Sequence, residues 1–206
     1  MRGLCSRSRL FAIALASSGG APVIALASSV RETPCSSTVP PTWPEQFVIV
    51  QRRIPDDDSG NSTTTTFYDF VRQANLIWIA PDSNESAVLW DLELGSGHSY
   101  YFTPTAKSCM RIEMPVGVLK PNWLENSTSL GERTLFGKRA CGWTKVDFID
   151  YWADASDGSP ISWYFHTMKA RFDTVYFAPG AQVPSPSYFV PPSYCNSSSM
   201  ARRSKS

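Results

Sequence analysis

Apolar and polar residues alternate with a period of two in the middle of the chain. Within 88–94, Trp90 and Leu92 alternate with Asp91 and Glu93, which is typical of a β-strand with one face on a core and the other in water. A Gly-Ser-Gly turn follows, and the alternation then resumes twice. The pattern predicts three consecutive antiparallel strands, at 88–94, 98–102 and 110–114.

Several other segments are rich in β-branched and aromatic residues and are bounded by Gly, Pro, Asn or Asp. Such segments favour extended structure, because these side chains pack well on a pleated surface and the bounding residues favour turns. They predict strands at 46–54, 64–72, 75–81, 161–168 and 172–178.

The stretch 116–152 links the two groups of predicted strands. Pro121 suits the first position of a helix, so we expect a short helix that runs through Trp123 and Leu124 and ends by Gly131. The β-formers and glycines of 135–148 then predict a strand, a sharp bend and a second strand.

These elements predict a mainly β fold. A twisted sheet of about nine or ten strands curls rather than staying flat, so we expect a single half-open antiparallel β-barrel with one short helix covering the sheet. We expect the Trp123 indole to plug the sheet against residues such as Trp90, Phe102 or Ile112. It would be either a structural core residue or a lid over a ligand.

The chain has 206 residues, of which 42% are apolar, and a net charge of +1. We expect one β domain over 28–195 with Pro-rich arms at both ends, and a disordered basic tail over 196–206. The near-neutral charge gives no case for nucleic acid as a partner. No segment after residue 27 approaches the roughly 20 apolar residues of a spanning helix, so no stable membrane insertion is expected.

The first 27 residues indicate a targeting segment. They contain arginines and no acidic residue, followed by two weakly apolar runs that end in Ala-Leu-Ala. This is typical of a signal peptide cleaved after Ala27, while an organellar transit peptide fits the same composition. We therefore expect the secretory pathway, extracellular or lumenal, with an organelle as the alternative.

Glycosylation acceptors and cysteines favour the secretory alternative. N-x-S/T acceptors lie in polar stretches at Asn61, Asn84, Asn126 and Asn196. Cleavage after Ala27 leaves an even number of widely spaced cysteines: Cys35, Cys109, Cys141 and Cys195. Two disulfides are the simplest interpretation, and four buried free thiols in a reducing compartment are the alternative.

Enzyme signatures are weak, so catalysis is uncertain and not favoured. His98 and His166 stand outside any H-E-x-x-H or H-x-H context, and no G-x-S-x-G elbow or Gly-rich phosphate loop is present. We expect no metal site and no cofactor, and interpret 56–58 as a solvated acidic turn. Carboxylates that could serve a glycosidase fall mostly on the expected wet side of strands: Asp91, Glu93, Glu113, Asp147 and Asp150.

Large apolar residues occupy both sides of some strands, as at 76–79 and 163–165. A sheet that is apolar on both faces needs a second apolar surface. The helix around Trp123 would cover part of it, and an apolar small molecule or lipid would cover more, while a completely filled core is the alternative. The candidate ligand-binding residues are Trp78, Trp90, Tyr100, Phe102, Ile112, Trp123 and Trp163.

Four motifs carry a resemblance: T-W-P-E-Q-F at 42–47, L-W-D-L-E at 89–93 with S-Y-Y-F at 99–102, G-V-L-K-P-N-W-L at 117–124, and C-G-W-T-K-V-D-F-I-D-Y-W at 141–152. Together they resemble a family of small secreted plant and algal proteins of unestablished function. Members are sometimes labelled glycosyl-group transferases, but no residue in this chain justifies that activity.

More distantly, the order of features resembles ependymin-related proteins: an early P-C, a Cys on a mid-chain strand, and a late P-x-x-Y-C. That resemblance implies a half-open antiparallel barrel like the periplasmic lipoprotein carriers, with an apolar cavity. It also implies that Cys35 pairs with Cys141 and Cys109 with Cys195. The function we expect is a secreted, disulfide-stabilised protein that binds a hydrophobic small molecule. A glycan-processing enzyme and a cell-wall or surface interaction module are the alternatives.

Overall fold

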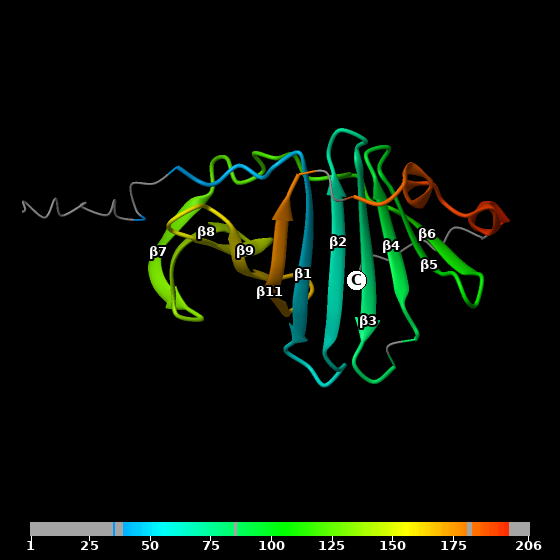
Figure 1. Ribbon diagram of the computed structural model, residues 1–206, viewed down its shortest axis with the longest axis horizontal. Coiled ribbons are helices and arrows are strands. Elements are labelled where there is room, and N and C mark those ends of the chain that lie inside the picture. Colours follow the sequence, from blue (N-terminus) through cyan, green and yellow to red (C-terminus); the bar gives the residue numbers. More distant parts are fainter. Residues whose placement is uncertain (1–34, 36–38, 85, 181–182, 198–206) are drawn as a thin grey trace, which may run out of the picture. The chain divides into compact units, whose positions relative to one another are not determined.

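The computed structural model describes residues 35, 39–84, 86–180 and 183–197, with the backbone alone at 196 and 197. The expected signal peptide lies outside the described residues, as does most of the expected tail. Eleven strands form one antiparallel sheet (Figure 1). They are β1 (Gln46–Pro55), β2 (Ser62–Asp69), β3 (Ala74–Pro81), β4 (Leu89–Leu94), β5 (His98–Thr103), β6 (Ser108–Glu113), β7 (Thr128–Leu135), β8 (Lys138–Lys145), β9 (Ile149–Asp154), β10 (Pro160–Phe165) and β11 (Ala170–Pro179).

The sheet is not closed. Its strand order is β6-β5-β4-β3-β2-β1-β11-β10-β9-β8-β7, so β6 and β7 are the two edges and β1 pairs with the last strand, β11. The expected mainly β, half-open antiparallel fold is confirmed. The sheet has eleven strands rather than nine or ten, because 128–135 is a strand. Its residues T-S-L-G-E-R-T-L are mostly exposed, as suits an edge strand, and show no apolar alternation.

One segment, 114–127, connects the two edges and crosses the sheet. The hydroxyl of Tyr68 donates to the carbonyl of Leu119 at 2.8 Å, and the amide of Trp43 donates to the carbonyl of Pro121 at 2.9 Å. Beyond Pro121 the chain forms turns, with i to i+3 bonds at Trp123, Glu125 and Ser127, rather than a regular helix. The segment covers the sheet as expected, and its own Leu124 is fully buried in the cluster between them.

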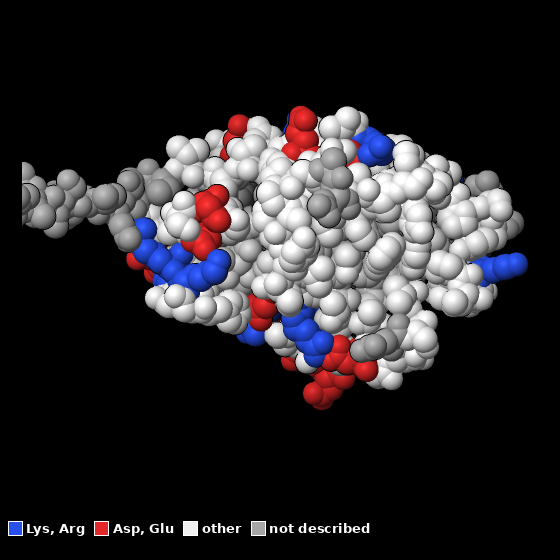
Figure 2. All heavy atoms as spheres, in the orientation of Figure 1, with Lys and Arg blue, Asp and Glu red and all other residues white. Residues whose placement is uncertain are grey.

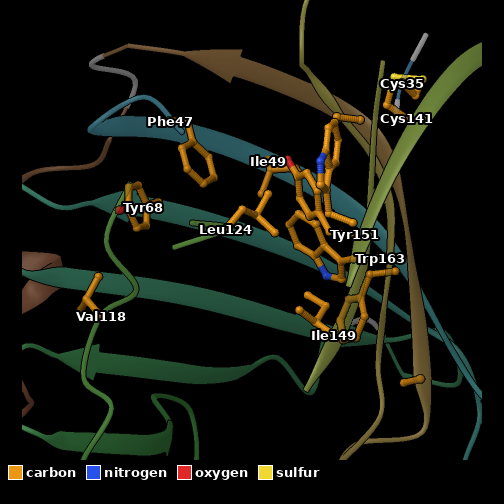
Figure 3. Close-up of a cluster of buried hydrophobic side chains, with 14 residues drawn as sticks. Cys35, Phe47, Ile49, Tyr68, Val118, Leu124, Cys141, Ile149, Tyr151 and Trp163 are labelled. Carbon is orange, nitrogen blue, oxygen red and sulfur yellow. A yellow bond between two sulfur atoms is a disulfide. The ribbon is translucent and has the colours of Figure 1, made fainter. Parts of the chain in front are cut away.

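The main hydrophobic core lies between this crossing segment and one face of the curled sheet, which we call the inner face. Phe47 and Ile49 of β1 share one buried cluster with Tyr151 of β9 and Trp163 of β10 (Figure 3). Strands separated in the sheet order can share a cluster because the sheet curls around it. Trp123 packs edge-on against Trp43, Tyr151 and Phe148. The expected packing on Trp90 or Phe102 is wrong, because those rings lie on the opposite face.

A second core lies on this opposite, outer face. Val48, Phe67 and Leu76 form its base. The C-terminal arm, residues 183–197, lies over it and contains two short 3-10 helices, η2 (Pro186–Phe189) and η3 (Ser193–Ser197). Phe189 and Cys195 of the arm are buried in this second core. Both faces of the same strands are therefore covered.

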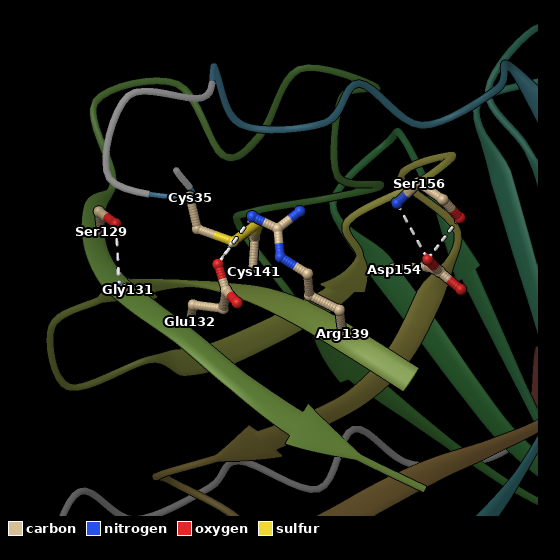
Figure 4. Close-up of a disulfide and its surroundings, with 8 residues drawn as sticks. All are labelled: Cys35, Ser129, Gly131, Glu132, Arg139, Cys141, Asp154 and Ser156. Carbon is tan, nitrogen blue, oxygen red and sulfur yellow. Dashed lines mark hydrogen bonds and ion pairs between the residues drawn. A yellow bond between two sulfur atoms is a disulfide. The ribbon is translucent and has the colours of Figure 1, made fainter. Parts of the chain in front are cut away.

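Two disulfides fasten the ends of the described chain. Cys35 is bonded to Cys141 of β8, and Cys195 to Cys109 of β6, which is the pairing that the ependymin resemblance implied. Beside the first bridge, the Arg139 guanidinium donates to the Glu132 carboxylate at 2.8 Å (Figure 4). Two disulfides fit an oxidising compartment.

Candidate functional site

The register of the outer face brings aromatic residues into one row. Trp78 of β3 is opposite Trp90 of β4, which is opposite Phe102 of β5, which is opposite Cys109 of β6. Directly opposed residues of antiparallel strands point to the same side of a sheet. The disulfide from Cys109 to Cys195 therefore holds the C-terminal arm at the end of this aromatic row.

Between the row and the arm lies a pocket of about 350 Å³, which we call the aromatic pocket. The prolines of the arm prevent it from adding a strand to the sheet, because proline cannot donate a ladder hydrogen bond. The arm crosses the outer face instead of pairing with an edge strand. The pocket is lined by Trp90 and Phe102 from the sheet and by Tyr188, Val190, Pro192 and Tyr194 from the arm.

The rings of the pocket support one another. The Tyr188 ring stacks on Trp90 with centroids 5.7 Å apart and planes 12° apart. Trp90 also lies 5.5 Å from Phe102 and 5.1 Å from Trp78. Tyr188 is 40% exposed. An apolar pocket with stacked aromatic walls and one exposed ring is suited to binding a flat or apolar molecule.

Charged side chains are sparse around the aromatic pocket and on the surface beside it. None of the described residues that line the aromatic pocket is Asp or Glu, and Lys107 in the β5–β6 turn is its one basic lining residue. Figure 2 shows the face seen in Figure 1, where the surface over β2 and β3 has few charged side chains and most of the charge is near the margins. The lining of the aromatic pocket is therefore mainly apolar.

The inner face carries a different set of residues. Tyr68, Asn75, Glu93 and Ser99 oppose one another across β2 to β5, so they form a polar row under the crossing segment. The amide of Asn75 donates to Glu93 at 2.8 Å, and the hydroxyl of Ser99 donates to Asp91 at 2.5 Å. Asp91 is only 4% exposed. The expectation that these carboxylates face water is wrong, because it is the inner face that the crossing segment covers.

Burial changes the acidity of the two carboxylates. Desolvation raises the pKa of Glu93 to about 7, with a further rise from the charge of Asp91, while the hydrogen bond from Asn75 opposes both. Desolvation also raises the pKa of Asp91 against the hydrogen bonds from Ser99 and Tyr101. The pair therefore holds protons more tightly than solvated carboxylates do.

This pair predicts a pH-dependent stability. A carboxyl group whose folded pKa lies above its ordinary value of 4.5 stabilises the fold below that value and loses the contribution as the pH rises through about 7. Glu93→Gln should remove this pH-dependent loss. The free energy of unfolding of the variant, relative to that of the parent protein, should therefore rise by as much as about 3 kcal/mol between pH 5 and 8, at about 1.36 kcal/mol per pKa unit. Urea denaturation across that pH range measures the difference.

The matched control is Glu113→Gln, which makes the same change at an exposed position on β6. It should leave the pH profile of stability unchanged. Equal profiles for the parent protein and Glu93→Gln would contradict a raised pKa at Glu93.

The two histidines take part in pairwise contacts. His98 Nε2 lies 2.8 Å from a guanidinium nitrogen of Arg111, and His166 Nε2 lies 3.2 Å from a carboxylate oxygen of Asp150. Among the described residues no group of three or more His, Cys, Asp or Glu side chains is placed to hold a metal ion. Within the described part of the chain, neither histidine therefore has the neighbours of a metal ligand.

The glycosylation acceptors that the structure describes with side chains are Asn61, Asn84 and Asn126, and all three are exposed. They lie in the β1–β2 loop, the β3–β4 loop and the crossing segment. The side chain of Asn196 is outside the described residues. Over the described part of the chain, no helix has the length and apolarity needed to cross a membrane.

The structure divides the seven candidate ligand-binding residues between the two faces. Trp90 and Phe102 line the aromatic pocket, and Trp78 and Tyr100 pack in the core beneath it. Trp163 and Trp123 belong to the inner core, and Ile112 lies on the inner side of edge strand β6, opposite Ser99. Sequence reasoning missed Tyr188 and Tyr194, which lie in the Pro-rich arm. The P-S-Y-C sequence that ends at Cys195 was the available signal that this arm is anchored.

One of the comparisons with known proteins supports the fold, and none of them indicates an activity. A crystal structure of an uncharacterized conserved protein from Thermus thermophilus superposes with a TM-score of 0.50 at 10% identity, over 72% of this chain and 86% of that one. At that identity the likeness shows the fold alone. No curated protein matches the chain. Residues 42–195 match the family model described as "Domain of unknown function (DUF8395)". Because the match spans most of the chain, from the lead-in before β1 to the second disulfide, the protein belongs to the DUF8395 family.

Proposed function

We propose that the protein binds an apolar small molecule in the aromatic pocket. The observation that carries the proposal is the space of about 350 Å³ between the Trp90–Phe102 row and a C-terminal arm that a disulfide fastens to β6. Most ligand sites are concave, largely apolar and preformed, with volumes from about 300 Å³ upward. The pocket lies at the small end of that range, which suits one ring system or one short chain.

The proposed setting is the secretory pathway. Both disulfides, the three exposed acceptor asparagines and the arginine-containing, Ala-rich start of the sequence support it. The resemblance to ependymin-related proteins also implies a carrier of apolar molecules. The pocket proposed here, however, lies on the outer face under the arm rather than inside the curled sheet.

The glycan-processing alternative has less support. Asp91 and Glu93 lie two residues apart on one strand, which places their α-carbons about 7 Å apart and beside each other rather than across a cleft. Asp91 is 4% exposed and holds a hydrogen bond from Ser99. A sugar ring cannot reach such a carboxylate without movement of the segment that covers it.

The test is binding of the neutral fluorescent probe Nile red. Tyr188→Ala removes the exposed ring that stacks on Trp90, so the affinity for the probe should fall about tenfold, which corresponds to about 1.4 kcal/mol. Since Tyr188 is 40% exposed, the melting temperature should change little. Fluorescence titration measures the affinity of the parent protein and the variant.

The control is Tyr176→Ala, which removes a 52% exposed ring from β11, four strands away from β4 in the sheet order. It should leave probe binding unchanged. Equal affinities for both variants and the parent protein would place the probe elsewhere and overturn the proposal.

A further inference from the structure

We propose that the aromatic pocket is a site for amphipathic carboxylic acids, with the ring or chain of the ligand on Trp90 and Tyr188 and its carboxylate on Lys107. This inference rests on the proposed function and adds the chemical class of the ligand. The nearest alternatives, a neutral apolar molecule and an amphipathic amine, become outcomes of the test.

The charge at the pocket has one sign. Lys107 lines the pocket, and no Asp or Glu is among the described lining residues. Lys107 is exposed, and none of the ion pairs found among the described residues involves it. A lysine at the edge of apolar walls is complementary to an anion, and it would oppose an amine of the same charge.

The fold fixes where this charge lies. Lys107 closes the turn 104–107 between β5 and β6, with its amide hydrogen-bonded to the carbonyl of Pro104 at 3.4 Å. Pro104 lines the pocket as well, and Cys109, two residues after Lys107, is bonded to the arm. The turn that carries Lys107, the arm and the aromatic row therefore surround the same pocket.

The volume of the pocket also limits the size of the ligand. A volume of about 350 Å³ is at the lower limit for small-molecule sites, which favours an aromatic acid or a medium-chain fatty acid over a lipid with two long chains. The long stem of lysine can lie along apolar surface while its ammonium reaches water. A carboxylate at the mouth would keep most of its hydration, so its desolvation cost stays small.

The experiment compares two ligands of the same shape, 1-naphthaleneacetate and its neutral amide, 1-naphthaleneacetamide. The parent protein should bind the carboxylate about five- to tenfold more tightly than the amide at low ionic strength, and added salt should reduce this ratio. Lys107→Gln should bring the ratio to about one by weakening the binding of the carboxylate, and Lys107→Arg should keep the preference. Calorimetric titration measures all of these affinities.

The matched control is Lys169→Gln. Lys169 is also exposed, lies in the β10–β11 turn, and shares with Lys107 a positive φ, 46° against 49°. Lys169→Gln should leave the ratio as it is in the parent protein.

The outcomes separate the two proposals. In one outcome, Tyr188→Ala weakens the binding of both ligands, but Lys107→Gln does not change the ratio of their affinities. That result overturns the carboxylate inference and leaves the proposed function standing. Tighter binding of 1-naphthaleneethylamine than of the carboxylate would also overturn the inference. Absence of binding of every ligand and of Nile red would overturn both.

Discussion

Trp43→Ala should lower the free energy of unfolding by about 3–5 kcal/mol, the usual cost of truncating a packed Trp. Trp43 precedes β1 and packs, half-buried, against the inner core. Its indole N–H donates to the Tyr151 hydroxyl at 3.0 Å, and its backbone amide holds the crossing segment at Pro121. Its ring lies within 6.2 Å of five other rings, those of Phe47, Tyr68, Trp123, Tyr151 and Trp163.

Urea denaturation of the variant measures this loss of stability. A second variant, Trp43→Phe, separates the part due to the hydrogen bond from the part due to packing. Phenylalanine keeps an aromatic ring but cannot donate to Tyr151, so it should lose the hydrogen bond, about 1 kcal/mol, together with part of the packing. We expect its stability to lie between those of the parent protein and Trp43→Ala. A loss below about 1 kcal/mol in Trp43→Ala would mean that the crossing segment is not fixed through this residue.

Much of the fold could be predicted from the pattern of the chain. The alternation at 88–94 correctly identified a strand and assigned Trp90 and Asp91 to opposite faces. It could not show which face is the inside, because a period of two defines two faces and gives no information about what covers either of them. Here the crossing segment covers the face of Asp91, and the arm covers the face of Trp90.

The rest depended on contacts that local pattern does not encode. β7 was missed because an edge strand in water needs no apolar alternation. Part of the aromatic pocket could be predicted, since Trp90 and Phe102 were candidates from their strands. Tyr188 was not, because it lies in a Pro-rich arm whose position depends on a disulfide between cysteines 86 residues apart in the sequence. The resemblance implied that bridge, but no pattern in the arm indicated which face it covers.

The two disulfides should have different consequences when removed. Cys35→Ala with Cys141→Ala opens a bridge with a sequence separation of 106, and should lower the free energy of unfolding by about 2–5 kcal/mol, since the bridge restricts the unfolded chain. Cys141 belongs to the inner core, far in the strand order from the aromatic row. The folded variant should therefore still bind Nile red with the affinity of the parent protein.

Cys109→Ala with Cys195→Ala is the comparison, because its bridge has a similar separation, 86 residues, and a similar expected effect on stability. This bridge, however, holds the arm that forms one wall of the aromatic pocket. The arm should move away from β4 and β5, and probe affinity should fall by at least about tenfold at temperatures where the variant is folded. Denaturation and probe titration on both variants separate the two effects. If both variants lose stability and both keep full probe binding, the pocket does not depend on the arm, and the site proposed between Trp90 and Tyr188 is wrong.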